Sequence, residues 1–202
     1  MTDPVGRHAL VLAGGASRRF GGAKLTALWR GEPLIRSSVR TALLSQVETV
    51  SVITGAEPAA VSEALAALGD PRLSLVHAPD WDEGMAASLR RGVASLRADA
   101  RAVVIFLGDM PCIPPSLADR LLDAIEAGAP AAVVRSQHGP AHPVAFSAAV
   151  FPELMRLSGD RGARALLQTL ADAVVAVACD DPGVIFDIDH PGDLAIRGNA
   201  GV

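Results

Sequence analysis

The stretch from Gly14 to Lys24 combines four glycines with three cationic side chains, which suits it to binding phosphate. The glycines fall in two pairs, Gly14–Gly15 and Gly21–Gly22. The cations are Arg18, Arg19 and Lys24. Glycines let backbone N–H groups turn inward and approach a ligand, and such groups bind anions. The sequence therefore predicts a phosphate-binding loop, although an ordinary strand-to-helix turn with solvated charges has the same composition.

Three carboxylates stand where a metal bound to those phosphates could be held. Asp109 follows the apolar run 102–107, and an unpaired carboxylate is costly to bury, so it either lies at an exposed edge or binds a cation. Asp187 and Asp189 are two residues apart, so in a strand they would face the same side. Mg²⁺ is typically held by one or two carboxylates together with substrate phosphates. We expect all three to bind Mg²⁺; the alternative for Asp109 is a turn residue before Pro111.

A phosphate loop, Mg²⁺ and cations together indicate nucleotidyl transfer. The reaction needs charge on the α-phosphate and the departing pyrophosphate to be neutralised. We expect Lys24 and Arg19 to contact the triphosphate and to act with Asp109 in catalysis, and Arg18 to help bind the nucleotide. A phosphate monoester acceptor has a second pKa of about 6 and is nucleophilic without a general base. This agrees with a sequence in which no Ser/His/Asp or Cys/His constellation stands out.

Two better-known phosphate loops do not match. The dinucleotide fingerprint requires G-x-G-x-x-G and an acidic residue at the end of the next strand, but the strand-like run 50–54 ends without a carboxylate. The P-loop requires Gly-Lys followed by Ser or Thr, whereas Lys24 lies between Ala23 and Leu25. A pyridine-nucleotide reductase is therefore disfavoured.

The segments that must position these residues alternate between strand and helix patterns. Predicted strands are 8–12, 50–54, 72–76, 102–107 and 131–135, and predicted helices are 33–44, 58–68, 84–97 and 115–127. This alternation favours βαβ units in a three-layer α/β/α fold with a mainly parallel sheet. Ligands in such sheets bind beyond the carboxyl ends of the strands, where the glycine loop and Asp109 both lie.

The pattern becomes irregular after residue 135. We expect strands at 143–146, 174–179 and 184–188, and helices at 148–157, 161–170 and up to about 197. No linker divides the chain, so 1–202 is expected to be one domain. Its nucleotide-binding part would span about 8–135, and its acceptor side about 136–197.

The composition of the chain further limits the classes of function that it could have. The net charge of −4 argues against nucleic acid as a partner. Half the residues are apolar and 3% are aromatic, which suits buried parallel strands. Two cysteines are too few for a disulfide framework or a Cys-ligated metal. Without a membrane span or signal peptide, a cytoplasmic protein is expected.

The loop resembles the signature L-A-x-G-x-S-x-R-x-G-x-x-K of the MobA-like nucleotidyltransferases. The matching residues are Leu12, Ala13, Gly15, Ser17, Arg19, Gly21 and Lys24. The resemblance implies a Rossmann-like nucleotidyltransferase (GT-A-like) fold and a loop that holds a nucleoside triphosphate. The family also carries G-D-x-P after its central strand and a D-I-D-type turn near its end, which agrees with a magnesium site.

The resemblance also implies a substrate. The family's best-known members attach CMP or GMP to molybdopterin. Gly14–Gly15 looks like the guanylyl version, whereas the Arg19-to-Lys24 spacing and the G-M-A-A-S-L turn look like the cytidylyl version. We expect CMP transfer from CTP to molybdenum cofactor, with Gly84, Ser88 and the Ala13–Gly14 backbone reading the base. Alternatives are guanylyl transfer, transfer to another phosphorylated metabolite, or a non-catalytic nucleotide-binding assembly protein.

The acceptor site is expected near Asp160. Arg161 and Arg164 would begin a helix, and a helix N-terminus with arginines favours a phosphate monoester. The block is similar to the family's acceptor-side segment; the alternative is that Asp160 caps the helix and both arginines are solvated. His142 is a weaker candidate for the same pocket. A transient contact with a molybdoenzyme or its chaperone would deliver the product.

Overall fold

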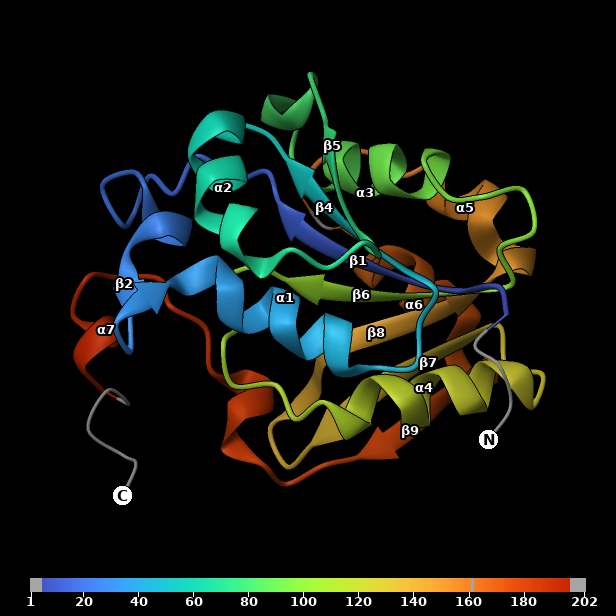
Figure 1. Ribbon diagram of the computed structural model, residues 1–202. Helices are drawn as coiled ribbons and strands as arrows, with labels where there is room; N and C mark the ends of the chain where they lie inside the picture. Colours follow the sequence, from blue (N-terminus) through green and yellow to red (C-terminus); the bar gives the residue numbers. More distant parts are fainter. Residues whose placement is uncertain (1–4, 161, 197–202) are drawn as a thin grey trace.

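The computed structural model describes residues 5–160 and 162–196. A seven-stranded sheet with the order β5-β4-β1-β6-β8-β7-β9 forms its middle layer (Figure 1). The strands are β1 (Arg7–Ala13), β4 (Thr49–Thr54), β5 (Leu73–His77), β6 (Ala102–Leu107), β7 (Ala131–Ser136), β8 (Gly139–Ser147) and β9 (Val174–Ala178). Strands β5, β4, β1 and β6 are mutually parallel, and β8 runs antiparallel to both of its neighbours. The prediction of a mainly parallel sheet is confirmed.

Helices cover both faces of the sheet (Figure 1). One face carries α1 (Leu34–Leu44), α2 (Pro58–Leu65) and α4 (Ser116–Glu126), and the other carries α3 (Met85–Ala94), α5 (Phe151–Leu154) and α6 (Arg164–Leu170). Strand β1 shows why two cores form, because successive side chains point to opposite faces. Ala9 and Val11 join the first core and Leu10 joins the second. The predicted three-layer α/β/α architecture is confirmed.

Short elements complete the chain. The strands β2 (Leu28–Trp29) and β3 (Glu32–Pro33) form a hairpin. Its turn residues Arg30 and Gly31 both have positive φ, as two-residue hairpin turns commonly require. The remaining elements are 3₁₀ helices η1 (Lys24–Thr26), η2 (Ala66–Leu68), η3 (Trp81–Glu83), η4 (Ala148–Val150), η5 (Ala171–Ala173) and η6 (Pro182–Ile185), and helix α7 (Asp193–Ile196).

The predicted strand at 184–188 is wrong. The segment begins as η6, because the Asp181 carboxylate accepts a hydrogen bond from Gly183 N at 2.7 Å and caps the turn. Residues 186–189 then run without regular structure. The argument that Asp187 and Asp189 face the same side of a strand therefore does not hold.

Two predicted helices are shorter than expected. The helix expected over 148–157 is η4 followed by α5, and it ends at Leu154. The helix expected over 161–170 begins at Arg164. Gly159 and Gly162 have φ of +72° and +51°, a left-handed backbone that a right-handed helix excludes, so the chain turns between the two helices.

The strand order places a crossover where a ligand would bind. From β1 the chain passes to β4 on one side, and β6 pairs with the other side of β1. The loops that leave the carboxyl ends of β1 and β6 are consequently neighbours, at the point where open α/β sheets bind ligands.

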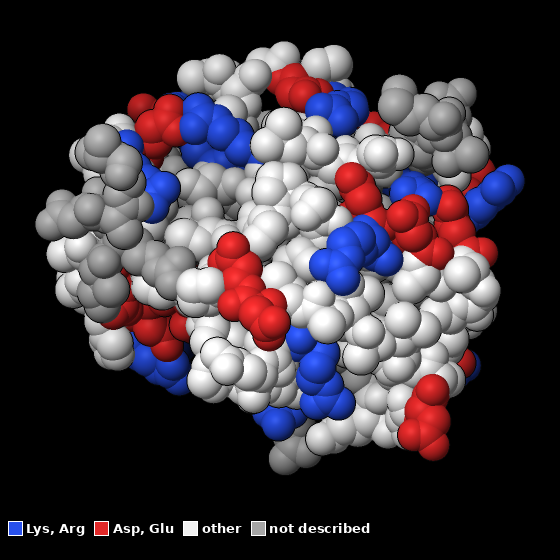
Figure 2. All heavy atoms as spheres, turned by 90° about the horizontal axis from the view of Figure 1, so that it is seen from below, with Lys and Arg blue, Asp and Glu red and all other residues white. Residues whose placement is uncertain are grey.

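The outer surface shown from below mixes Lys and Arg with Asp and Glu among uncharged residues (Figure 2). This face therefore does not gather one sign of charge. Over residues 5–160 and 162–196, no helix is long and apolar enough to cross a membrane.

Candidate active site

The glycine loop directs a run of backbone N–H groups outward. Within the described chain, the N–H groups of residues 15–18 donate no hydrogen bond, and all four residues line a cleft. The next turn is closed by the Ser17 carbonyl, which accepts hydrogen bonds from the N–H groups of Phe20, Gly21 and Gly22 at 3.0–3.2 Å. The first glycine pair therefore belongs to the anion site. Gly21 and Gly22 shape the turn and do not line the cleft.

Asp109 is held rigidly at the end of β6. Gly108 N donates to Leu12 O at 2.9 Å, which ties the turn to β1. The buried Ser38 hydroxyl of α1 donates to the carbonyls of Gly108 and Met110 at 3.1 and 3.2 Å. A Cβ on Gly108 would lie 2.8 Å from Ile35 Cδ1 and 3.1 Å from Leu12 O, so a larger residue there would force the Ile35 side chain to shift.

The D-I-D segment docks against the same turn. Ile188 N donates to Asp109 O at 3.1 Å. The Asp193 carboxylate accepts hydrogen bonds from the N–H groups of Asp189 and His190 at 2.9 and 2.7 Å. These backbone contacts bring Asp189 beside Asp109, 80 positions earlier in the sequence.

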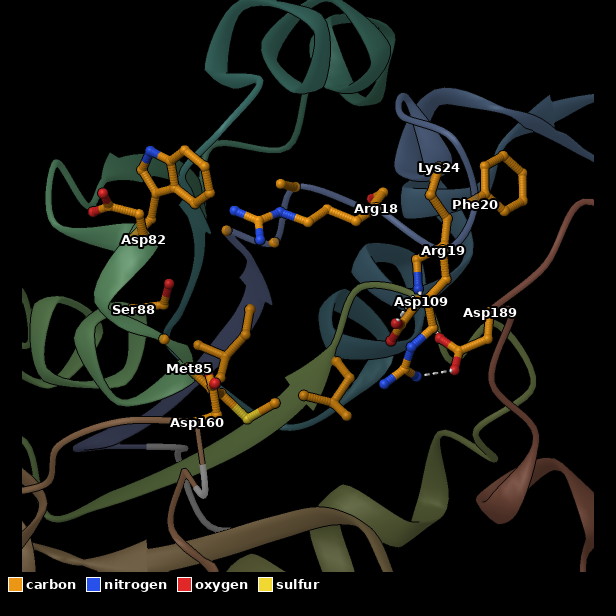
Figure 3. Close-up of a pocket in the computed structure, with 18 residues that line it drawn as sticks. Arg18, Arg19, Phe20, Lys24, Asp82, Met85, Ser88, Asp109, Asp160 and Asp189 are labelled. Atoms are coloured by element: carbon orange, nitrogen blue, oxygen red, sulfur yellow. Dashed lines mark hydrogen bonds and ion pairs between the residues drawn. The ribbon is translucent and has the colours of Figure 1, made fainter.

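Four side chains then form an alternating row of charges, here called the cleft cluster: Arg19, Lys24, Asp109 and Asp189. Lys24 Nζ lies 2.6 Å from Asp109 Oδ2 and 3.5 Å from Asp189 Oδ1. Arg19 Nη1 lies 2.8 Å from Asp189 Oδ2 (Figure 3). Desolvation acts to raise the pKa of Asp189, but the hydrogen bond from Arg19 and the nearby positive charges outweigh it and lower that pKa.

The carboxylates of this region fit a divalent cation that is also bound by a phosphate. Among the residues that the structure describes, no group of three or more potential ligands is arranged to hold a metal alone. Asp109 and Asp189 nevertheless both approach one cation, the Lys24 ammonium. Two carboxylates and substrate oxygens suffice for Mg²⁺. Asp187 is exposed and outside the cleft. Desolvation of its carboxyl group by neighbouring atoms, with repulsion from Asp189 and Asp109, raises its pKa.

The opposite wall comes from η3 and the start of α3. The cleft has a volume of about 500 Å³, within the usual range for ligand sites. In Figure 3, Asp82, Met85, Ser88 and Asp160 face the cleft cluster across it, and Arg18 extends between the two sides. The residues that line the cleft are Leu12, Gly14, Gly15, Ala16, Ser17, Arg18, Arg19, Phe20, Lys24, Trp81, Asp82, Gly84, Met85, Ser88, Leu107, Asp109, Asp160 and Asp189.

Close contacts explain three glycines at and beside the cleft. A Cβ on Gly14 would lie 2.4 Å from the Ser88 hydroxyl, and a Cβ on Gly84 would lie 2.4 Å from Asp160 Oδ1. Gly55, which the sequence analysis did not select, is equally constrained, because its Cβ would lie 2.3 Å from Gly14 O. The loop after β1 thus packs directly on the wall formed by α3.

Arg90 of α3 joins the two segments of this wall. Its guanidinium donates to the carboxylates of Asp80 and Glu83, at 3.0 and 2.9 Å, on either side of Trp81. It also donates to Leu157 O at 2.8 Å, in the segment that leads to Asp160. Arg90 therefore fixes η3 and the 157–160 segment relative to each other.

Several predicted site residues lie outside the cleft. Ala13 is buried at the end of β1. Arg164 is exposed at the start of α6, and the N-cap of that helix is Ala163 rather than Asp160. His142 is half-buried on β8; its Nδ1 has no partner among the described residues, and burial lowers its pKa. The prediction for Arg161 lies outside the described residues.

Sequence reasoning missed six lining residues. These are Ala16, Phe20, Trp81, Asp82, Met85 and Leu107. Of these, Trp81 gave a usable signal, as an aromatic residue in a polar loop directly before the predicted helix at 84–97. The others depend on how closely the β1 loop approaches α3, which spacing alone does not reveal.

The site combines a loop with free backbone N–H groups and a row of cations and carboxylates, all at the carboxyl ends of parallel strands. These are features of a Rossmann-like nucleotidyltransferase. The model of the MobA-like NTP transferase domain matches residues 9–174. The chain belongs to this family.

Similar proteins and solved structures match this chain over nearly its whole length. The chain is 34% identical over 188 residues to the purine catabolism protein PucB of Bacillus subtilis, covering 89% of this chain and 90% of that protein. It is 31% identical over 188 residues to a molybdenum cofactor guanylyltransferase of Cereibacter sphaeroides, covering 92% of each. The crystal structure of Rv0371c from Mycobacterium tuberculosis superposes with a TM-score of 0.81 at 27% identity, over 96% and 97% of the two chains. A complex of Rv0371c with manganese gives a TM-score of 0.77.

Proposed function

We propose that this chain transfers CMP from CTP to molybdenum cofactor and releases pyrophosphate, with Mg²⁺ as cofactor. The observation that carries the proposal is the cleft cluster beside the free N–H groups of residues 15–18. A triphosphate and a divalent cation are the ligands that such a set of donors and carboxylates suits. The proposal includes a cytoplasmic location.

Each group of the cleft has a role in that reaction. The N–H groups of residues 15–18, with Arg18, Arg19 and Lys24, bind the triphosphate and neutralise the charge that develops on pyrophosphate. Asp109 and Asp189 hold the divalent cation, with Asp187 close by. When bound, that cation supplies further neutralisation of phosphate charge. The acceptor phosphate needs no general base, since it is ionised at neutral pH.

CTP is the proposed donor because the loop spacing and the turn at Gly84 are similar to those of cytidylyl enzymes. Gly14, Gly84 and Ser88 would read the base, together with the backbone of Ala13. Guanylyl transfer is the second candidate, favoured by Gly14–Gly15 and by the molybdenum cofactor guanylyltransferase relative.

The acceptor is proposed to enter from the side built by residues 136–197. Asp160 lines the cleft on that side, and His142 lies near enough to Asp109 for its pKa to be influenced by that carboxylate. Arg164 would contact an acceptor that extends beyond the cleft, together with Arg161. The same side would meet a molybdoenzyme or its chaperone transiently.

The test is a pyrophosphate-release assay with Mg²⁺, molybdopterin and each nucleoside triphosphate offered separately. The proposal expects release with CTP at a higher kcat/KM than with GTP, and none without molybdopterin. A clear preference for GTP would assign the guanylyl reaction instead. If neither CTP nor GTP yields pyrophosphate in the presence of molybdopterin, the proposed acceptor is contradicted.

A further inference from the structure

The charges of the cleft cluster satisfy one another in this structure. Lys24 contacts Asp109 and Asp189, and Arg19 contacts Asp189. Under the proposed function the same cations bind a triphosphate, and the same carboxylates bind a divalent cation. The two carboxylates could not keep their full contact with a single ammonium if they also held a metal. The internal ion pairs must therefore open when the ligands bind.

Lys24 is chemically suited to change partners. It is the only lysine among the 18 Lys and Arg residues of the chain. An ammonium is a compact point charge whose three donors rotate on a flexible stem, whereas a guanidinium binds a carboxylate through a rigid fork. The Lys24 side chain is 10% exposed, so its charge is held close to the carboxylates and is only weakly screened by solvent.

Arg18 differs from both cations of the cleft cluster. Its side chain is exposed and extends across the cleft (Figure 3). In the described part of the chain it forms no ion pair with a carboxylate. Arg18 is thus available to an incoming phosphate without breaking an internal contact, whereas Lys24 and Arg19 are not.

We propose that Lys24 is an internal substitute for the divalent cation, so that metal and nucleotide bind cooperatively by exchanging partners with it. A nucleotide draws the ammonium from Asp109 to a phosphate and leaves the carboxylate open to the metal. A metal at Asp109 and Asp189 displaces the ammonium toward the phosphates. Each ligand removes the competitor of the other, and linkage makes the effect reciprocal. This inference rests on the proposed function, because it requires a site for a triphosphate and a cation.

The proposal predicts effects of opposite sign for one substitution. Lys24→Met removes the competitor of the metal and also a ligand of the phosphates. It should tighten the binding of Mn²⁺ alone and weaken the binding of the nucleotide, each by about tenfold, the order usual for coupled ligands. A lysine that served only to bind phosphate, or only to stabilise the fold, would not tighten metal binding when removed.

The experiment measures Mn²⁺ affinity from the electron paramagnetic resonance signal of free Mn²⁺, with and without an α,β-methylene analogue of CTP or GTP. Nucleotide affinity is measured by calorimetry with and without Mn²⁺. Arg97→Met is the matched control, because Arg97 forms an exposed ion pair with Asp99. In the unmodified protein each ligand should tighten the other about tenfold. Lys24→Met should reduce this coupling to the part that comes from direct contact between the metal and the phosphates, and Arg97→Met should keep it whole.

A second measurement uses the unmodified protein and does not depend on how the variant folds. Protein labelled with ¹³C-lysine gives the side-chain signals of Lys24 alone. Titration with Mg²⁺ should shift its Cε signal with the same midpoint as metal binding. A stationary Lys24 signal at saturating metal would overturn the inference.

The two proposals fail in different ways. In one outcome, the unmodified protein binds nucleotide but Lys24→Met binds Mn²⁺ no more tightly than the unmodified protein does. This result overturns only the role of Lys24 as a substitute cation. If the unmodified protein binds no nucleoside triphosphate at any Mn²⁺ concentration, the proposed function itself is overturned.

Discussion

A cation lies between two carboxylates at each end of strand β1, and the two cations are held differently: Arg7 belongs to the strand, whereas Lys24 follows the loop that leaves its carboxyl end. At the amino end, Arg7 contacts Asp123 and Glu126 of α4 at 2.5–2.9 Å through Nε and Nη2, and its own side chain is 5% exposed. At the carboxyl end, Lys24 contacts one carboxylate at 2.6 Å and another at 3.5 Å.

The comparison separates a structural ion pair from an exchangeable one. The Arg7 fork makes three hydrogen bonds to a single helix, which locks α4 to the sheet. Lys24 instead contacts carboxylates from two separate loops, and it lines a cleft. We therefore expect substitutions at the amino end to change stability and substitutions at the carboxyl end to change activity.

The largest effect is expected for Asp109→Asn. It removes the charge of a carboxylate that touches Lys24 but keeps its shape, so pyrophosphate release should fall about a thousandfold. The free energy of unfolding should change by only about 1–2 kcal/mol, because an amide oxygen can still accept from Lys24 and Asp189 keeps its charge beside that ammonium. Steady-state kinetics and urea titration check both values. Full activity in this variant would mean that Asp109 takes no part in the reaction.

Lys24→Arg should lower kcat/KM roughly tenfold to a hundredfold even though the charge is kept. The guanidinium would bind the carboxylate through its fork, as Arg7 does at the other end, and would exchange partners less readily. The measurement is kcat/KM at saturating Mg²⁺, with Arg40→Lys as the control because Arg40 pairs with Glu32 at the surface. An unchanged kcat/KM would show that the Lys24 ion pairs need not exchange partners, contrary to the expected difference from Arg7.

Arg7→Met should lower the free energy of unfolding by about 1–2 kcal/mol, because three part-buried hydrogen bonds to carboxylates are lost, and solvent at the exposed carboxylates limits their contribution. Its kcat should stay within about twofold of the unmodified value, since Arg7 lies at the opposite end of β1 from the cleft. Urea unfolding and the pyrophosphate assay decide the matter. A strong loss of activity without a loss of stability would contradict the assignment.

The smallest effect is expected from His8, also at the amino end. Its Nδ1 lies 2.8 Å from Thr49 Oγ1, its Nε2 has no partner among the described residues, and burial lowers its pKa. The unfolded chain, with an ordinary pKa of about 6.5, therefore binds more protons than the folded one as the pH falls below that value. The contribution of this residue to stability should therefore decrease from pH 7 to pH 5.

The check compares urea unfolding of His8→Leu with that of the unmodified protein at both pH values. The stability of His8→Leu should depend less on pH than that of the unmodified protein. An equal slope in His8→Leu would show that His8 does not contribute to it.

The strands and helices were predicted correctly where the local sequence pattern and the tertiary contacts favour the same element. The continuous apolar run 102–107 is β6, and Asp109 follows it at the cleft. The C-terminal third was harder to predict, because short segments there take their shape from tertiary contacts. Val184 is fully buried although it lies in a 3₁₀ turn. The run of apolar residues around it therefore has the pattern of a buried strand without forming one.

The candidate site shows the same division. The residues of the glycine loop follow one another, so their spacing alone indicated a shared ligand. The pairing of Lys24 with Asp109 joins residues 85 positions apart, and the contact between Gly14 and Ser88 depends on how α3 packs. Such contacts follow from the strand order, which no local pattern encodes.

The turn closed by the Ser17 carbonyl bears on the entropy of binding. Three N–H groups converge on that oxygen, and this fixes the backbone of residues 17–22 without a ligand. Ordering one residue costs about 1–2 kcal/mol of conformational free energy. Because folding has already ordered this segment, part of the binding site for a phosphate at the N–H groups of residues 15–18 is preorganised. More of the contact energy is then available to hold the ligand.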